Sequence, residues 1–404
     1  MRIVDVCAFY SPTGGGVRTY IEAKLRAAAR LGHELIIIAP GAREEIIERG
    51  PGAVIATIPS PVLPLDRSYR YFHDRKMLHR VLDAWRPDHV EVSSPWLSAE
   101  MVGCWQGAAT RSLVMHCDPL AAYAYRWLGS LAEISTIDRW FGWFWHRLRR
   151  LDGMFDPIVC ANRGLADRLR AGGVGNAVTI PMGVEEGIFS PTLRTPELRA
   201  EVLGSLGLDP AVPLLIGVGR FSAEKRWDMV IRAAAECART RPLGFALVGD
   251  GPRRRQLKRL AGRFGNCAVL PPIENRGELA RFMASADGLV HGGEAETFCM
   301  VAAEARASGI PLIVPDRGGA ADQVLRGAGL AYAAASRRSL THALEAFIAH
   351  GVELQRARAA HQCSVRGMSA HFEDLFEHYG RLARRRPERE AAKVATALAI
   401  ARSG

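Results

Sequence analysis

The first half of the chain alternates short apolar runs with longer amphipathic stretches. Two of these stretches, 17–31 and 69–85, have the apolar spacing of helices. Apolar runs of strand length lie between and beyond them, at 3–7, 34–39, 54–58, 89–93, 112–117, 157–160 and 178–180. Strands that alternate with helices predict a mostly parallel sheet with helices on both of its faces.

The same alternation starts again in the second half, with strand-like runs at 214–218, 244–248, 268–270, 288–290 and 312–314. Between the halves, residues 181–196 contain proline and glycine but no hydrophobic periodicity, which is typical of a linker. We therefore expect an α/β protein of two Rossmann-like domains with a ligand-binding cleft between them. The first domain would span 1–182, the linker 183–196 and the second domain 197–363.

The C-terminal part of the chain contains one more helical pattern, within residues 364–386. Its apolar residues recur at helical spacing: Phe372, Leu375, Phe376, Tyr379 and Leu382. The last residues, 387–404, are basic and rich in alanine, and we interpret them as a tail.

The bulk composition narrows the class of protein. A chain of 404 residues is too long for one core, which agrees with two domains. No run approaches 18 apolar residues, so we predict no membrane-spanning helix, and the first ten residues read as a buried strand rather than a signal peptide. The eight cysteines include no C-x-x-C pair, so we expect reduced thiols in a cytoplasmic protein and no metal site.

The chain is basic, with a formal net charge of +11 and a pI of about 9.6. Part of this charge is expected to bind an anionic substrate. The remainder would suit an anionic membrane surface, which we favour over nucleic acid as a partner.

Two carboxylates stand out in the segment 291–319, which reads HGGEAETFCMVAAEARASGIPLIVPDRGG. Glu296 and Glu304 are separated by seven residues, the last four of which, 300–303, are good helix formers. Gly309 reads as a stop signal. If the helix begins near Glu296, Glu304 lies two turns further on, about 12 Å along the axis. They would then contact the two ends of an elongated ligand, with a phosphate or sugar at the helix start and a ribose diol further along. Taken alone, the spacing also fits a solvated helix.

Cations and glycines follow strand-like runs in both halves. Arg220 and Lys225 come after the run 214–218, where two cations can clamp a diphosphate and neutralise it as it leaves. Gly15 and Gly16 open the first helix, where free N–H groups favour an anion. Surface charge and a tight turn are the alternative explanations. The glycines do not form a G-x-G-x-x-G motif, which argues against a nicotinamide-dependent oxidoreductase.

His116 and Asp118 lie in the sequence LVMHCDPL, directly after a strand-like run. Because ligands bind at the carboxyl ends of parallel strands, we expect His116 to face the cleft as an active-site residue. Asp118 has a competing explanation, since an Asp-Pro pair is ordinary turn chemistry.

Residues 139–150, RWFGWFWHRLRR, combine aromatic rings with arginines. We expect one continuous helix here, because Trp140, Trp145 and the apolar residues one turn further would share a side. Trp beside Arg is typical of the interface between protein and lipid. The residues expected to face an anionic membrane are Trp140, Trp143, Trp145, Arg147, Arg149 and Arg150. The alternative is a helix packed on its own domain.

Taken together, these motifs resemble the retaining glycosyltransferases of family 4, which have the GT-B fold. The matching stretches are ETFCMVAAEARASGIPLIVPDRGG, SPTGGGVRTYIEAKLRAAARLGHELIIIAPG, TIPMGVEEGIFSP and GVGRFSAEKRWDMVIRAAA, and they cover nearly the whole chain. One departure is Cys299, where most relatives have glycine.

The resemblance implies roles for individual residues. Glu296 would lie near the donor sugar, Glu304 would bind the nucleotide ribose, and the C-terminal helix would cross back to the first domain. The implied catalytic residues are His116, Arg220, Lys225 and Glu296. The implied donor-binding residues are Gly15, Gly16, Arg220, Lys225, Glu296, Phe298, Cys299, Met300, Val301 and Glu304.

The resemblance also implies the reaction. A hexose would pass from a nucleotide-diphosphate sugar, of the GDP-mannose or UDP-glucose type, to a membrane lipid or glycan intermediate, with retention of configuration and without a metal. The protein would then sit peripherally on the inner face of the plasma membrane. A sugar-nucleotide epimerase of the same fold and a non-catalytic lipid-binding relative are the alternatives.

Overall fold

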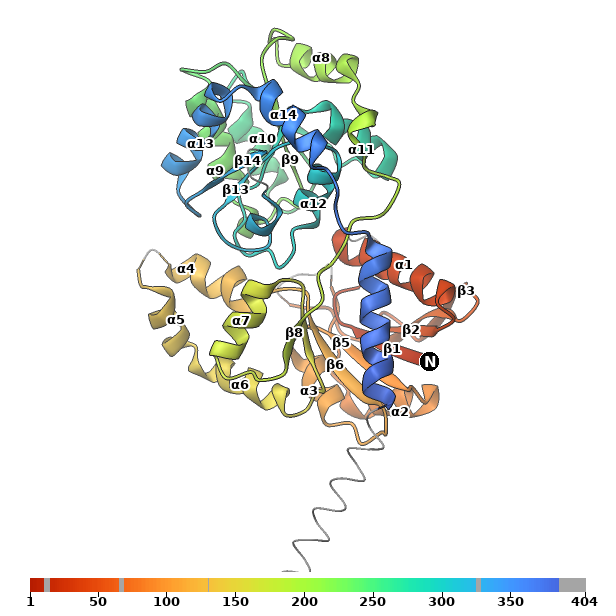
Figure 1. Ribbon diagram of the computed structural model, residues 1–404. Coiled ribbons are helices and arrows are strands. Elements are labelled where there is room, and N and C mark those ends of the chain that lie inside the picture. Colours follow the sequence, from red (N-terminus) through yellow and green to blue (C-terminus); the bar gives the residue numbers. More distant parts are fainter. Residues whose placement is uncertain (11–14, 65–68, 130, 325–327, 385–404) are drawn as a thin grey trace, which may run out of the picture. The chain divides into compact units, whose positions relative to one another are not determined.

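The computed structural model describes residues 1–10, 15–64, 69–129, 131–324 and 328–384. These residues form two compact units (Figure 1). Unit 1 comprises 1–116, 138–181 and the C-terminal part from Ser369, and unit 2 comprises 117–137 and 182–368. The expected α/β class is confirmed in both units, each of which is built on a sheet of mainly parallel strands. In the part of the chain that the structure describes, no helix is long and apolar enough to span a bilayer.

Unit 1 contains a sheet with the strand order β3-β4-β2-β1-β5-β6-β7-β8. Its strands are β1 (Arg2–Cys7), β2 (Glu34–Gly41), β3 (Glu45–Gly50), β4 (Ala53–Pro59), β5 (His89–Ser93), β6 (Thr110–Met115), β7 (Ile158–Cys160) and β8 (Ala177–Thr179). Every neighbouring pair is parallel except β3 and β4. The edge strand β3 was not predicted, because five of its six residues are exposed and it lacks a buried apolar run.

Helices of the first part of the chain are α1 (Gly15–Arg30), α2 (Arg75–Trp85), α3 (Leu97–Gly103), the π-helical turn η1 (Leu120–Tyr125), α4 (Arg126–Leu128), α5 (Ile134–Trp140), α6 (Gly142–Asp152) and α7 (Arg163–Ala171). Helix α2 starts six residues later than predicted. The reason is local, since the Asp74 side chain accepts a hydrogen bond from the Met77 N–H and caps the helix there.

The predicted C-terminal helix is confirmed from residue 368 to the last described residue, 384. It is the long blue ribbon beside the strands of unit 1 in Figure 1. The Tyr379 hydroxyl donates a hydrogen bond of 2.7 Å to the Glu91 carboxylate. The Tyr20 hydroxyl oxygen lies 3.0 Å from the Nε2 atom of His371. Lys24, fully buried, bridges Glu91 and Asp5, which face one another on β5 and β1. This buried network fixes the helix to the sheet. The predicted tail, 387–404, lies outside the described residues.

Unit 2 contains a wholly parallel sheet with the order β11-β10-β9-β12-β13-β14. Its strands are β9 (Leu214–Val218), β10 (Gly244–Val248), β11 (Cys267–Leu270), β12 (Gly288–Val290), β13 (Leu312–Pro315) and β14 (Gly329–Tyr332). Strand side chains alternate between two cores, so that Leu214 and Ile216 lie in one and Leu215 in the other. The edge strand β14, GLAY, was not predicted because it is too short and too poor in β-branched residues to stand out.

The helices of unit 2 surround this sheet. They are η2 (Pro191–Leu193), α8 (Pro196–Ser205), η3 (Ala223–Lys225), α9 (Trp227–Cys237), α10 (Arg254–Ala261), α11 (Arg276–Ser285), α12 (Met300–Ala307), η4 (Ala321–Gln323), α13 (Arg337–Ala349) and α14 (Val352–His361). Asp287, at the start of β12, is almost fully buried and ion-pairs with Arg194, Arg199 and Arg356. It thereby ties η2, α8 and α14 to the sheet.

The unit boundaries differ from the predicted domains in two places. Residues 117–137 were expected in the first domain but group with unit 2, where Glu224 and Arg220 act electrostatically on Tyr123. The expected linker, 183–196, is also part of unit 2. There Val184 forms a β-bridge with Gly367, so the two segments that run between the units are hydrogen-bonded to one another.

Candidate active site

The strand order of unit 2 reverses between β9 and β12, which are neighbours in the sheet although β10 and β11 come between them in sequence. In open parallel sheets, ligands bind at such a switch point, beyond the carboxyl ends of the strands. The loop after β9 carries Arg220 and Lys225, and the loop after β12 carries His291 and Glu296. The fold therefore brings three predicted site residues, Arg220, Lys225 and Glu296, to one edge of the sheet, together with His291.

Lys225 and Glu296 form an ion pair across this switch point. Burial acts to lower the pKa of Lys225, but Glu296 outweighs it and the pKa is raised. Burial likewise acts to raise the pKa of Glu296, yet Lys225 and His291 hold it far below its ordinary value. Both groups are consequently charged throughout the physiological pH range.

Close packing of two loops brings the pair together. A Cβ atom at Gly292 would lie 2.6 Å from the carbonyl oxygen of Lys225, and one at Gly293 would lie 2.9 Å from that of Glu224. Only glycine allows the loop after β12 to approach the turn η3 this closely. The Arg220 side chain is exposed. Its backbone carbonyl accepts a hydrogen bond of 2.9 Å from the Trp227 indole N–H.

The helix between the two glutamates starts later than predicted. Glu296 lies in the loop, and α12 begins at Met300, so the expected two turns of helix between Glu296 and Glu304 are wrong. Cys299 is the N-cap and has a left-handed backbone with φ of 62°. A left-handed conformation costs a non-glycine residue about 1–2 kcal/mol. That cost explains why a glycine would suit this position. Burial also raises the Cys299 pKa strongly, which keeps the thiol protonated.

Glu304, in the middle of α12, is buried and paired. Its carboxylate accepts a hydrogen bond of 2.6 Å from Arg276, the first residue of α11. Phe298, Met300 and Val301 are half-buried around the start of α12, where the N–H groups of the first turn have no partner within the helix. The predicted donor-binding residues after β12 thus belong to one loop and the helix that follows it.

One group of side chains in the described part of the chain has the composition of a metal site. Potential ligand atoms of His291, Glu296 and Cys299 all lie within 4.8 Å of one another. Glu296 is already paired with the Lys225 ammonium, and His291 Nε2 lies 3.3 Å from the same carboxylate. The local charge balance of this group is therefore met by a protein cation.

Unit 1 contains the other predicted site residues. His116 follows β6, is half-buried, and packs edge-on against Tyr20 with ring centroids 4.9 Å apart. Burial lowers the pKa of His116 to about 4, so the ring is neutral at pH 7. Gly15 and Gly16 are the first two residues of α1. Gly14, which precedes them, lies outside the described residues.

Asp118, grouped with unit 2, makes the turn contacts that an Asp-Pro pair favours. Its Oδ1 atom accepts hydrogen bonds from the N–H groups of Leu120 and Ala121, at 3.1 and 3.2 Å. The turn explanation is therefore sufficient for this residue.

The aromatic segment differs from the predicted continuous helix. The helix breaks at Phe141, before the poor helix former Gly142, which separates α5 from α6. Trp145 is only 7% exposed and belongs to the core, so the expectation that it faces a membrane is wrong. Trp140 and Trp143 are exposed, at 57% and 62%.

The arginines of this segment are partly engaged with their own unit. Arg147 and Arg150 both ion-pair with Glu100, and Arg149 donates a hydrogen bond of 3.0 Å to the Gly172 carbonyl. Arg150 nevertheless remains about half exposed. All three arginines that were predicted to face lipid therefore have partners within the protein.

Comparison with known proteins identifies the family. Residues 14–187 match the family described as Glycosyltransferase Family 4, and residues 200–362 match Glycosyl transferases group 1. A GDP-mannose-dependent alpha-(1-6)-phosphatidylinositol dimannoside mannosyltransferase of Mycobacterium tuberculosis is 30% identical over 368 residues, covering 89% of this chain and 91% of the relative. The chain belongs to the family 4 (group 1) glycosyltransferases.

Three further proteins are similar to this chain, one in sequence and two in structure. A GDP-mannose-dependent alpha-mannosyltransferase of M. tuberculosis is 29% identical over 97% of this chain and 99% of the relative. Among solved structures, sucrose-phosphate synthase of Thermosynechococcus elongatus has a TM-score of 0.69 at 20% identity, covering 95% and 99% of the two chains. The lipopolysaccharide glycosyltransferase WaaG has a TM-score of 0.64 at 17% identity, covering 93% and 98%. These structural neighbours confirm the GT-B fold.

Two arginines outside the predicted site residues also make ionic contacts in the candidate site of this glycosyltransferase. Arg226 binds Glu294 through both Nε and Nη2, and Arg276 binds Glu304. Arg226 is adjacent to the predicted Lys225. Arg276 follows the strand-like run 268–270, so the rule that ligands lie beyond strand ends could have drawn attention to it.

Proposed function

We propose that this glycosyltransferase transfers a mannosyl group from GDP-mannose to a lipid acceptor of the phosphatidylinositol mannoside type. Both mycobacterial relatives are GDP-mannose-dependent mannosyltransferases by name, which supports the choice of donor. The first is also named for a phosphatidylinositol dimannoside, which supports the choice of acceptor. The observation that carries the proposal is the Lys225–Glu296 ion pair at the switch point, since it combines a cation for the diphosphate with a carboxylate beside the sugar.

The reaction follows from the proposed placement of the donor. The bond between the anomeric carbon and the diphosphate oxygen breaks, and the acceptor hydroxyl oxygen bonds to that carbon on the same face, with retention. The acceptor proton passes to the departing diphosphate. Arg220 and Lys225 would stabilise the charge that develops on the diphosphate, and the Lys225 ammonium would be shared between it and Glu296.

These cations also support a metal-independent reaction. Two positive side chains can provide the charge neutralisation for which other enzymes use a divalent ion. Turnover that is unchanged by EDTA is the expected result. Turnover abolished by EDTA and restored by Mg²⁺ or Mn²⁺ would contradict this part of the proposal.

The acceptor class makes a peripheral membrane position part of the proposal, on the inner face of the plasma membrane. Exposed apolar side chains that support it are Tyr123, Trp127 and Leu131 in unit 2 and Trp140 and Trp143 in unit 1. Arg126 lies 5.6 Å from the Trp127 ring, which pairs a cation with an exposed aromatic as at lipid headgroups.

A donor screen tests the proposed reaction. The protein is incubated with GDP-mannose, UDP-glucose or other nucleotide sugars, with and without phosphatidylinositol mannosides, and the released nucleotide is measured. We expect release of GDP that depends on the acceptor, and an α-mannosidic bond in the product by NMR.

Three other outcomes would overturn the proposal. Conversion of the sugar nucleotide to an isomer without any acceptor would identify an epimerase. Nucleotide binding without turnover in any combination would indicate a non-catalytic relative. Turnover with a soluble acceptor alone would move the protein away from lipids.

A further inference from the structure

We propose that Arg276 is a positioning residue of the donor site, which holds Glu304 as an ionised acceptor for the nucleotide ribose. The inference rests on the proposed function, because it takes the ligand of Glu304 to be a nucleoside diphosphate. Arg276 itself is not required to contact the ligand.

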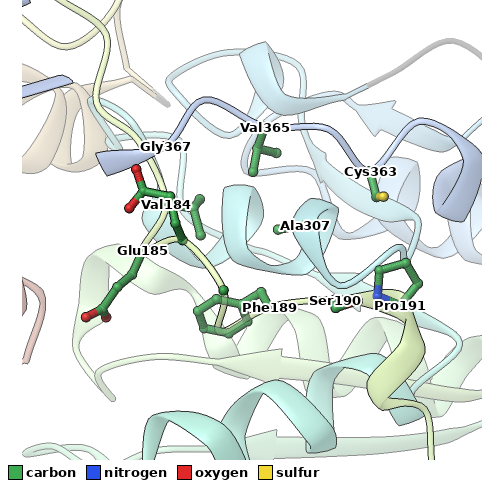
Figure 2. Close-up of a pocket in the computed structure, with 11 residues that line it drawn as sticks. Val184, Glu185, Phe189, Ser190, Pro191, Ala307, Cys363, Val365 and Gly367 are labelled. Carbon is green, nitrogen blue, oxygen red and sulfur yellow. The ribbon is translucent and has the colours of Figure 1, made fainter. Parts of the chain in front are cut away.

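Arg276 has three contacts that fix its guanidinium. Its Nη2 atom donates to Glu304 at 2.6 Å, and its Nε atom lies 3.7 Å from the Glu185 carboxylate. The guanidinium carbon also lies 4.9 Å from the centre of the Phe189 ring. Figure 2 shows Glu185 and Phe189 extending from the same connecting segment, at the edge of a pocket of unit 2. Contact with two carboxylates and an aromatic ring restricts the guanidinium.

The backbone places Arg276 for this contact. The Asn275 side chain caps α11 by accepting a hydrogen bond of 3.1 Å from the Glu278 N–H, so Arg276 is the first residue of the helix. Helix α11 packs against α12, which carries Glu304 near its middle. The contact therefore joins two rigid helices rather than two loops.

Burial and two neighbouring charges determine how readily Glu304 ionises. The Glu304 side chain is only 6% exposed. Burial, the largest effect, and the Glu185 charge raise the pKa of Glu304 above its ordinary value, and Arg276 opposes them by charge and by hydrogen bonding. Among the described residues, Arg276 and Glu185 are the two charged groups that act on Glu304. Without Arg276, Glu304 would retain burial and a like charge, and both favour the protonated acid.

Protonation would weaken ribose binding for a simple reason. A ribose diol offers two O–H donors, and an ionised carboxylate can accept both. A protonated acid has lost acceptor capacity and carries a donor of its own. A hydrogen bond to a charged group is worth about 1.5–3 kcal/mol, so its loss should weaken binding about 10- to 100-fold.

The test is a titration with GDP between pH 6 and pH 9, as about the range in which such acids ionise when buried. We expect Arg276→Gln to weaken GDP binding about 10- to 100-fold at pH 7, and to recover affinity as the pH rises and Glu304 ionises. The affinity of the wild type should change only with the ionisation of the terminal GDP phosphate, at about pH 6, and this common change cancels when the variant is compared with the wild type. Arg276→Lys, which keeps the charge, should restore much of the affinity at pH 7.

Two controls separate positioning from mere stability. Arg281→Gln removes an exposed arginine from the same helix and should change neither affinity nor its pH dependence. Glu304→Gln should be weak at every pH, and adding Arg276→Gln to it should cost nothing further. The melting temperature of each variant shows whether unit 2 remains folded.

The outcomes distinguish failure of the inference from failure of the proposed function. If the wild type binds no nucleoside diphosphate from a panel of GDP, UDP and ADP, the proposed function fails. If the wild type binds GDP but Arg276→Gln binds as well, or binds weakly at all pH values, Arg276 does not control the ionisation of Glu304. If the wild type binds GDP and 2′,3′-dideoxy-GDP with equal affinity, Glu304 does not bind the ribose hydroxyls.

Discussion

Lys225 and Glu296 form an ion pair that joins the loop after β9 to the loop after β12. The two residues are 71 positions apart in the chain, and each lies about one-fifth exposed. An arriving diphosphate would find this cation already held beside a carboxylate. If the donor binds here as proposed, we expect this arrangement to reduce the reorganisation needed during transfer.

The two predicted diphosphate cations should both be essential for turnover. We expect Lys225→Ala and Arg220→Ala each to lower kcat by ~10²-fold or more, because each removes a partner of the charge that develops on the leaving diphosphate. Initial rates of GDP release measure the effect. Arg255→Ala, an exposed arginine on α10, serves as the matched control and should leave the rate unchanged. Near-normal turnover in both cation variants would remove them from the mechanism.

Glu296 and Glu304 should affect different parts of the donor. Glu304→Ala should weaken binding of free GDP, because its carboxylate is expected to hold the ribose. Glu296→Ala should leave GDP binding within a few-fold but lower kcat, because its carboxylate is expected beside the sugar. Calorimetric titration with GDP, together with steady-state rates, separates the two effects. Similar losses of GDP affinity in both variants would contradict this division.

The buried Asp287 should be a strong determinant of unit 2 stability. Asp287→Asn leaves Arg199 and Arg356 without their shared anion, and breaking a buried ion pair on one side costs about 3–5 kcal/mol. Hydrogen exchange followed by mass spectrometry should therefore become faster in the peptides of α8, α14 and β9. Glu201→Gln, an exposed change on α8, is the control. Unchanged exchange in Asp287→Asn would show that the pairs contribute little.

His116 should make the protein less stable in acid. Its folded pKa is about 4, below the ordinary value of 6.5, so between these values the unfolded chain binds the proton and the folded protein does not. The contribution of His116 to the free energy of unfolding is therefore fully present above pH 6.5 and is lost as the pH decreases toward 4. The half-buried ring is partly screened, so we expect on the order of 1 kcal/mol between pH 7 and pH 5.

The difference in unfolding free energy between wild type and His116→Asn measures this effect. Other histidines titrate in both proteins and cancel in the difference. A difference that stays constant from pH 7 to pH 5 would mean that His116 titrates normally.

The exposed aromatic residues should contribute to membrane binding. We expect the protein to sediment with vesicles that contain phosphatidylinositol or phosphatidylserine, and salt to weaken this binding because part of it is screened Coulomb attraction. Replacing Trp140 and Trp143 with Ser should reduce sedimentation and leave GDP affinity intact. Ile46→Ser, which removes an equally exposed apolar side chain from β3, is the control. A wild-type protein that ignores anionic vesicles at low salt would contradict peripheral membrane binding.

The sequence by itself determined the sheets and the chemistry at their edges. Central strands such as β9 and β12 are buried on both faces, so they appear as uninterrupted apolar runs. Residues that follow such strands, including Arg220, Lys225 and Glu296, could be recognised because parallel strands present their carboxyl ends on one edge. The edge strand β3 gave no such signal, since it buries almost nothing.

Only the tertiary structure decided which side chains meet and which are buried. The sequence of the aromatic segment does not distinguish Trp145 from Trp143, yet packing buries the first and exposes the second. Likewise, nothing near Glu304 in sequence points to Arg276, because that contact depends on how α11 packs against α12. Periodicity is a local property of the chain. Burial and ion pairing depend on residues that are distant in sequence, so their contributions to stability are determined only when the helices pack together.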